Sequence, residues 1–263
     1  MKRRRSSIAW WLVFLFGVLY FFLPLVATLD FSLKAKPAFA AYTNSVQDPK
    51  FVASLLYSLV IGVLTIAASL ALIVPTAFWV RLRVPRARSL VEFVTLLPFV
   101  IPAVVLVFGL IRVYSRPPLP LTHTDFGSSA LLVVGYVVLS LPYMYRAVDT
   151  GLRSIDVRSL TEAAQSMGAG WLTILWRIIL PNIRVALLSG AFLTLAIVLG
   201  EFTIANYLAR PAFGPYLNLL SQSKAYEPAA VALISFGLTW LAMSVIAVLG
   251  RDTRTRIEIG GAH

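Results

Sequence analysis

Six long apolar runs, separated by polar segments rich in arginine or proline, dominate this sequence. They cover about residues 8–29, 51–80, 92–113, 129–145, 185–208 and 229–249. A helical run of about 20 apolar residues matches the thickness of a bilayer. Inside hydrocarbon the backbone has to satisfy its own hydrogen bonds, which favours helices. The pattern therefore predicts an all-α membrane protein with six transmembrane helices.

The first apolar run, residues 8–29, also has an interpretation as a secretory signal peptide. Ala38, Phe39 and Ala40 resemble a small-residue cleavage site. However, the run is longer than a usual signal-peptide core, and the candidate cleavage site lies far beyond it. We therefore expect an uncleaved transmembrane helix.

Lysine and arginine are distributed unevenly between the segments that connect these runs. With six crossings, 16 of the 23 basic residues fall on the side of the two termini and 7 on the opposite side. Because basic loops stay in the cytoplasm, we expect both termini and the loop 146–184 to be cytoplasmic. The predicted parts are a basic tip with the first helix (1–29), a five-helix core that carries this loop (51–249), and a cytoplasmic tail (250–263).

The composition agrees with a membrane protein and excludes other classes of site. Hydrophobic residues make up 59% of the 263 residues and charged residues 13%, whereas soluble domains average about 25% charged residues. A net charge of +12 would suit a nucleic-acid partner, but the basic residues flank apolar runs, so we expect a lipid bilayer instead. There is no cysteine, and His123 and His263 lack partners at metal-binding spacing, so no metal site is expected.

The longest predicted cytoplasmic loop contains a segment that local rules predict to be helical. Asp156 or Ser159 can cap its start, and Ser159 with Glu162 fits a capping box in which the glutamate reaches back to the cap amide. Ala163 and Ala164 favour a helix, and their small side chains let another protein approach its backbone closely.

Two glycines and a proline delimit the next part of this loop. Gly168 and Gly170 permit a turn with positive φ that ends the first helix. Residues 171–180 then show an amphipathic pattern whose apolar face comprises Leu172, Leu175, Ile178 and Ile179. Pro181 is expected to break this helix. On these grounds alone, a protein-docking element and an amphipathic helix anchored in lipid headgroups are comparable interpretations.

The spacing within the loop favours the docking element. It reads Glu-Ala-Ala-x3-Gly-x9-Ile-x-Leu-Pro, at Glu162, Ala163, Ala164, Gly168, Ile178, Leu180 and Pro181. This pattern resembles the signature of the permease subunits of type I ATP-binding-cassette (ABC) importers, and it lies in the predicted cytoplasmic loop before the penultimate helix. The resemblance extends from the second to the sixth helix and implies the MetI-like permease fold. Many relatives carry a second proline where this chain has Val185, which would change the entry angle of the fifth helix.

In that family the loop forms a coupling helix that inserts into a groove of the ATPase subunit. The resemblance therefore implies ATPase-coupling roles for Glu162, Ala163, Ala164 and Gly168. The loop would be supported by Asp156, Ser159, Ile178, Leu180 and Pro181. The four coupling residues would transmit force and perform no covalent chemistry, so no catalytic residue is expected.

The resemblance also implies partners. Such permeases work with two ABC ATPase subunits that bind ATP and Mg²⁺, with a second permease, here expected to make a heterodimer, and with an extracytoplasmic solute-binding protein. This chain has no Gly-x4-Gly-Lys-Ser/Thr phosphate-binding loop. We expect a non-catalytic, multi-pass subunit of the bacterial inner membrane that binds no cofactor itself.

Local similarity favours one class of solute. Residues 156–164 and the Arg81-x-Arg83 pattern after the second helix look like those of the spermidine/putrescine permeases. Permeases for ferric iron, thiamine and aminoethylphosphonate share much of the same pattern. A polyamine-like cation is therefore favoured, with the other compounds as alternatives.

One carboxylate lies inside a predicted membrane helix. Glu201 is costly at that depth unless it faces a water-filled cavity or a partner. It is a candidate pathway residue that would meet a cation, together with Asn206 and Tyr207 near the outer vestibule. Two other interpretations stay open: Glu201 extends to the outer interface, or it pairs with a sister subunit. The main functional alternative is an ion-coupled secondary transporter working alone, although that class normally needs several intramembrane ionisable groups.

Overall fold

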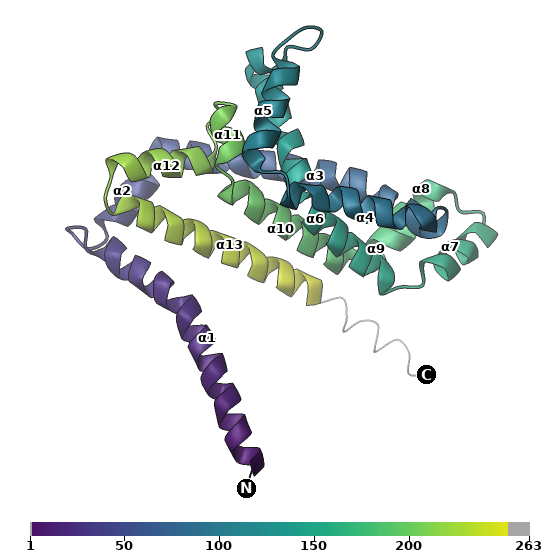
Figure 1. Ribbon diagram of the computed structural model, residues 1–263, viewed down its shortest axis with the longest axis horizontal. Helices are drawn as coiled ribbons and strands as arrows, with labels where there is room; N and C mark the ends of the chain where they lie inside the picture. The colour runs from purple at the N-terminus through teal and green to yellow at the C-terminus, as the bar shows by residue number, and fades with distance from the viewer. Residues whose placement is uncertain (1, 252–263) are drawn as a thin grey trace. The chain divides into compact units, whose positions relative to one another are not determined.

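The computed structural model describes residues 2–251, and every regular element in that range is a helix (Figure 1). The predicted all-α class is therefore confirmed. The predicted cytoplasmic tail, residues 250–263, falls almost wholly outside the described residues.

The chain divides into two compact units. The first comprises residues 1–52 and 217–241, and the second comprises residues 53–216 and 242–263. Three helices have residues in both units: α3 (Pro49–Leu82), α12 (Phe213–Ser223) and α13 (Glu227–Arg251). The division predicted from the sequence, into residues 1–29, 51–249 and 250–263, stays a prediction.

The first unit contains α1 (Lys2–Leu33) and α2 (Ala40–Gln47), the latter in a segment expected to be a loop. Within α1, Trp10–Leu33 is apolar and long enough to cross a bilayer, and none of its most apolar stretch is buried. Side-chain contacts fix the end of α1: Ser32 bonds the Tyr42 hydroxyl at 2.6 Å, and the rings of Phe31 and Tyr226 lie 5.2 Å apart. This segment is thus one long helix, as predicted.

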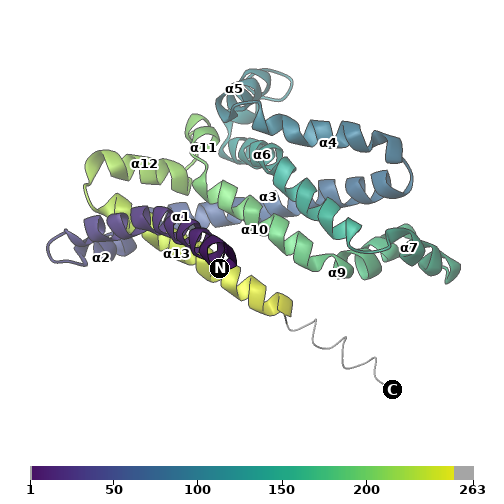
Figure 2. The same ribbon diagram turned by 60° about the horizontal axis from the view of Figure 1, so that its bottom comes forward.

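The second unit is built on α6 (Asp125–Arg153) and α10 (Arg184–Gly200), which run side by side (Figure 2). Glycines make this close approach possible: a Cβ at Gly151 would lie 2.6 Å from the Ala186 methyl group. Helix α3 contributes buried hydroxyl groups, including that of Ser69, which bonds Ser140 of α6 at 3.0 Å. Small residues and hydroxyl pairs of this kind are typical of helix packing in membranes.

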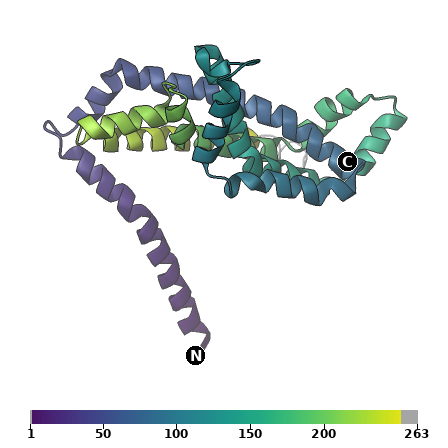
Figure 3. The same ribbon diagram turned by 45° about the horizontal axis from the view of Figure 1, so that its top comes forward.

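Two apolar runs that were expected to be continuous helices are broken. The third run divides into α4 (Arg88–Leu96), which continues as a short 3₁₀ turn, η2 (Leu97–Phe99), and α5 (Ala103–Tyr114). The two parts, 85–99 and 103–114, are bent by 98° at the break between them. Figures 1 and 3 show α5 turned away from α4. The physical reason is that Pro98 and Pro102 supply no amide hydrogen to continue the helix. The fifth run stops at Gly200 and resumes as α11 (Thr203–Tyr207).

The described residues contain three helices that are long and apolar enough to cross a bilayer, or five if each bent pair counts as one span. The apolar part of α13 described up to Leu241 is shorter. Six crossings with cytoplasmic termini therefore stay a prediction. The remaining short turns are η1 (Pro85–Ala87) and η3 (Leu121–His123).

Two hydrophobic cores in the second unit determine where the functional segments lie. One joins α3 and the end of α6 to the predicted loop 146–184 that carries the Glu-Ala-Ala motif, called the motif loop below. Its residues include Phe78, Met144, Leu152, Ala164, Ile174 and Ile179. The other surrounds α11, through residues that include Val107, Leu132, Tyr136, Val198 and Ile204. The loop and the α11 region are therefore packed at opposite ends of α10.

Candidate functional site

The motif loop contains the predicted short helix, α7 (Val157–Ser166). Asp156 caps it, because its carboxylate accepts hydrogen bonds from the Ser159 amide at 3.1 Å and the Ser159 hydroxyl at 2.7 Å. These bonds, the hydroxyl first, lower the pKa of Asp156 below its usual value. The start of α7 is thus set by a local bond that stabilises an ionised cap.

The expected capping box is wrong. Glu162 does not reach back to the cap amide but accepts a hydrogen bond from Arg158 Nε at 2.8 Å, one turn earlier on the surface of α7. This bond raises the pKa of the Arg158 guanidinium. Because Asp156 already caps the amide of Ser159, the glutamate is left on the exposed face, where a basic neighbour at i−4 offers a better partner.

The three motif residues at the centre of α7 face different environments. Glu162 and Ala163 are exposed, whereas Ala164 is 1% exposed and belongs to the core shared with α3 and α6. One residue that sequence reasoning missed is Met167, which follows the helix and is 80% exposed. It lies four residues after Ala163 and so on the same face. Nothing in its spacing marked it, because a single methionine carries no pattern.

The turn after α7 depends on Gly168. Its φ is +82°, the Gly168 amide bonds the Gln165 carbonyl at 2.9 Å, and the Ala169 amide bonds the Ala164 carbonyl at 3.0 Å. This is the Schellman arrangement, which places a left-handed residue directly after the helix. Gly170 was also expected to supply a positive φ, but its φ is −76°. Only Gly168 therefore needs to be glycine for conformational reasons.

We expect Gly168→Ala to destabilise the loop by roughly 1–2 kcal/mol, the cost of a left-handed conformation for a residue with a Cβ. No atom lies within 4 Å of the position that a Cβ would occupy, so the effect is conformational and not steric. Gly170→Ala, which also meets open space, is the matched control and should leave stability unchanged. Thermal unfolding of the purified variants measures the difference. Equal melting temperatures would contradict the assignment.

The segment after this turn consists of α8 (Trp171–Thr173), a π-helical stretch η4 (Ile174–Ile179) and α9 (Leu180–Asn182). The expected apolar face is only partly correct. Ile174 and Ile179 are fully buried, with Leu175 and Ile178 packed at their sides, but Leu172 is exposed. A π-helical turn contains more residues than an α-helical turn, so it rotates the face that an α-helical pattern predicts.

Pro181 does not end this segment. Helical geometry continues to Asn182, and the chain then bends by 80° into α10. Pro181 occupies the first turn of α9, where no amide hydrogen is needed. It is exposed, while Leu180 is partly buried against the core.

A groove of about 470 Å³ separates the motif loop from the end of α3. Arg83, at the end of α3, lies 5.2 Å from the ring centre of Trp171 and 6.0 Å from that of Trp79. Arg158 and Glu162 line the other side. Cation–π contacts of this kind connect the α3 end to the loop.

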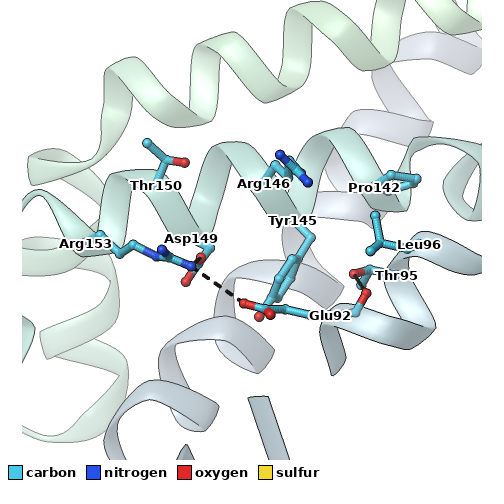
Figure 4. Close-up of a pocket in the computed structure, with 9 residues that line it drawn as sticks. All are labelled: Glu92, Thr95, Leu96, Pro142, Tyr145, Arg146, Asp149, Thr150 and Arg153. Atoms are coloured by element: carbon cyan, nitrogen blue, oxygen red, sulfur yellow. Dashed lines mark hydrogen bonds and ion pairs between the residues drawn. The ribbon is translucent and has the colours of Figure 1, made fainter. Parts of the chain in front are cut away.

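Next to the loop, a cluster of charged residues joins α3, α4 and α6. Figure 4 shows three of its members, Glu92 of α4 and Asp149 and Arg153 of α6. Asp149 is its centre, with oxygens 2.5 Å from Arg153, 3.3 Å from Arg88 and 3.9 Å from Arg81. The Glu92 carboxylate accepts a hydrogen bond from Arg88 Nε at 2.9 Å and lies 3.6 Å from the Arg153 guanidinium. Glu92 therefore pairs with two arginines. The cluster borders a cavity of about 290 Å³ between α4 and α6.

The predicted pathway residues lie at the opposite end of α10 from the motif loop. Glu201 follows α10, and its carboxylate accepts hydrogen bonds from backbone amides of α11. Asn206 and Tyr207 are exposed on α11, and the Tyr207 ring lies 4.8 Å from that of Phe108 on α5. The structure brings these three residues together but keeps them apart from the motif loop. No cluster of three metal-ligating side chains occurs among the described residues.

A comparison with protein families identifies the chain. A family model described as the binding-protein-dependent transport system inner membrane component matches residues 69–255. The chain belongs to this family. The permease is accordingly a multi-pass protein of the inner membrane and a subunit of an ABC importer, as its motif loop predicts.

Known relatives of the permease carry the names of different solutes. A probable molybdenum ABC transporter permease of Haloferax volcanii is 28% identical over 89% of this chain and 87% of its own length. The spermidine/putrescine permease PotB of Escherichia coli is 24% identical over 61% of this chain and 62% of its own. Others are named sulfate, ferric and methionine transport permeases.

A solved structure confirms the fold. A chain of a bacterial alginate ABC transporter, crystallised with a periplasmic protein bound to an alginate pentasaccharide, superposes with a TM-score of 0.75. The alignment covers 95% of this chain and 96% of that chain, at 16% identity.

Proposed function

We propose that the permease forms half of a translocation pathway and that α7 receives the movement of an ABC ATPase. In this proposal two ATPase subunits bind ATP and Mg²⁺, a second, non-identical permease completes the pathway, and an extracytoplasmic binding protein delivers the solute. ATP binding draws the ATPases together, moves the loop 146–184 and opens the pathway outward, and hydrolysis resets it.

The observation that carries this proposal is the two-sided character of α7. Its outer face presents Glu162, Ala163 and Met167 to solvent, while Ala164 is buried in the core formed with α3 and α6. A small residue beside an exposed methionine offers a partner close backbone approach and an adaptable apolar contact. Because the inner face is packed, a force on the outer face reaches the membrane helices instead of only deforming the loop.

The supporting residues give this helix a fixed shape. Asp156 and Ser159 set its start, Gly168 turns the chain, and the partly buried Ile178 and Leu180 hold the following segment against the core. Pro181 begins the last short turn before α10. We assign support to Asp156, Ser159, Ile178, Leu180 and Pro181, and coupling to Glu162, Ala163, Ala164 and Gly168.

For the solute, we propose a polyamine-like cation on the strength of the local resemblance to spermidine/putrescine permeases. The names of the relatives also include molybdenum, sulfate and ferric transporters. Uptake of labelled spermidine into vesicles that contain the complete transporter, with unlabelled molybdate, sulfate and ferric citrate as competitors, tests the proposal. Spermidine uptake that molybdate or sulfate does not reduce supports it, and transport of only an anion overturns it.

The coupling role is tested by purifying the tagged permease in mild detergent and identifying what co-purifies by mass spectrometry. We expect an ABC ATPase and a second permease. Ala163→Trp, which places a large side chain on the exposed face of α7, should insert normally but recover little ATPase. If the wild type purifies alone and takes up solute in vesicles without ATP, the ion-coupled secondary transporter is the correct class.

A further inference from the structure

Glu201 ends one helix and begins another. Its backbone is extended, with φ −83° and ψ 126°, where α10 stops. Its Oε1 accepts a hydrogen bond from the Thr203 amide at 2.7 Å, and its Oε2 accepts one from the Ile204 amide at 2.9 Å. Oε1 also lies 3.1 Å from the Ile204 nitrogen. Both oxygens of the carboxylate are thus used by backbone donors that the helix itself cannot satisfy.

The surroundings hold this break in one geometry. A Cβ at Gly214 would lie 2.4 Å from the Glu201 carbonyl oxygen, so the chain after α11 packs directly against the break. The Phe213 amide donates to Ser58 of α3 at 2.8 Å. After α11 the chain turns at Ala209, whose φ is +53°. The next residue, Arg210, pairs with Asp125 of α6 at 2.7 Å.

The short helix that Glu201 begins has one buried and one exposed face. Ile204 and Ala205 are fully buried in the core around Tyr136, whereas Asn206 and Tyr207 are exposed. A helix of five residues is too short to be stable by itself. Its position therefore depends on packing and on the bonds at its first turn, which Glu201 supplies.

The partners of the carboxylate explain how a charge is kept at this depth. A carboxylate in a membrane protein needs compensating donors, and the amides of Thr203 and Ile204 provide them. The buried Tyr136 hydroxyl also lies near the Glu201 carboxylate and has no other polar partner among the described residues. A solute cation would have to compete with bonds that already stabilise the charge.

We infer that Glu201 is a positioning residue: it fixes α11, and with it Asn206 and Tyr207, and its negative charge does not bind the solute. The inference rests on the proposed importer function only for its activity measurements. It assigns to Glu201 a role that depends on hydrogen-bond acceptance, so a neutral acceptor should replace it.

The test compares Glu201→Gln with Glu201→Ala in the complete complex in nanodiscs. Glutamine keeps an acceptor oxygen within reach of the two amides, and alanine keeps none. Asp30→Ala, which removes an exposed carboxylate paired only with Lys34, is the control. Hydrogen–deuterium exchange of the peptide that contains residues 203–207 should be about 3- to 30-fold faster in Glu201→Ala, as expected for a lost helix cap. In the control it should match the wild type. In Glu201→Gln it should stay closer to the wild type than to Glu201→Ala, because one glutamine oxygen can accept from both amides although its NH2 group cannot replace the second carboxylate oxygen.

A thiol reports on the exposed face of α11. The chain has no cysteine, so Asn206→Cys introduces a single labelling site. Its reaction rate with a membrane-impermeant maleimide should be unchanged by Glu201→Gln and altered by Glu201→Ala. ATPase activity of the complex and spermidine uptake should follow the same order, with glutamine within about twofold of the wild type.

Two results would overturn the inference. Unchanged exchange at residues 203–207 in Glu201→Ala would mean that the carboxylate is not the cap. Loss of ATPase coupling or uptake in Glu201→Gln to the level of Glu201→Ala, with exchange still slow, would mean that the charge itself acts on the solute. A wild-type complex without ATP-driven uptake would contradict the proposed function, while the exchange measurement would still decide the role of Glu201.

Discussion

Glu162→Lys is expected to leave the permease inserted and folded but to abolish ATP-driven uptake. Glu162 is exposed, and its bond to Arg158 lies on the surface of α7, so the substitution disturbs the fold of this chain little. At a docking surface the same change reverses a charge against a complementary partner. Losing one such partner costs about 2 kcal/mol or more, which is about a 30-fold loss of association. The amount of ATPase that co-purifies with the tagged variant, relative to the wild type, measures this loss of association.

A double variant separates docking from helix stability. Arg158→Glu combined with Glu162→Lys restores an ion pair between these two positions with reversed polarity. If the single variant fails because α7 is weakened, the double variant should recover. We expect it not to recover, because a partner still meets the wrong charge at position 162. Normal uptake by Glu162→Lys at normal protein level would contradict the assignment of α7 as the coupling helix.

Much of the framework could be predicted from the sequence, because it depends on strong and local signals. The apolar runs around α3 and α6 predicted long helices because lipid leaves the backbone no other way to satisfy its hydrogen bonds. Gly168 could be assigned to a turn because few other residues tolerate a φ of +82°. The Glu-Ala-Ala motif of the motif loop could be recognised as a permease signature because the spacing of its residues is fixed.

The breaks in the helices could not be predicted in the same way. Pro98 and Pro102 occur in a run that reads as one span, and membrane helices often tolerate proline. The prolines remove the amide hydrogens at the bend of 98° between α4 and α5, but that the helix breaks there and not at other prolines depends on packing that the sequence does not show. At Glu201 the sequence suggested a buried charge but not its partners, because backbone amides carry no sequence signal.

The charged cluster around Asp149 was missed for a related reason. Its two local pairs, Arg88 with Glu92 and Asp149 with Arg153, have the i,i+4 spacing that a search for helical ion pairs finds. That these pairs join each other and Arg81 follows only from the packing of α4 and α3 against α6.

Asp149→Asn is expected to weaken the connection between the coupling loop and the membrane helices. Asp149 is 16% exposed and faces three arginines, so its neutral form would leave Arg88 and Arg153 with Glu92 and would take from Arg81 the carboxylate that it contacts. The expected loss of folding free energy is about 2 kcal/mol, between the values typical of an exposed and of a buried ion pair. This corresponds to a melting temperature lower by about 4–8 °C. Uptake per ATP hydrolysed should fall as well, because the cluster lies where α6 leads into the loop.

Two further variants make this result specific. Asp30→Asn changes the same residue type on α1, where the carboxylate is 68% exposed and pairs with the exposed Lys34, so it should have little effect. Adding Arg153→Gln to Asp149→Asn removes one of the uncompensated positive charges and should recover part of the lost stability, since the two side chains lie 2.5 Å apart. Equal melting temperatures for Asp149→Asn and Asp30→Asn would mean that the cluster is a surface feature, and α7 would then act on the helices through the apolar core alone.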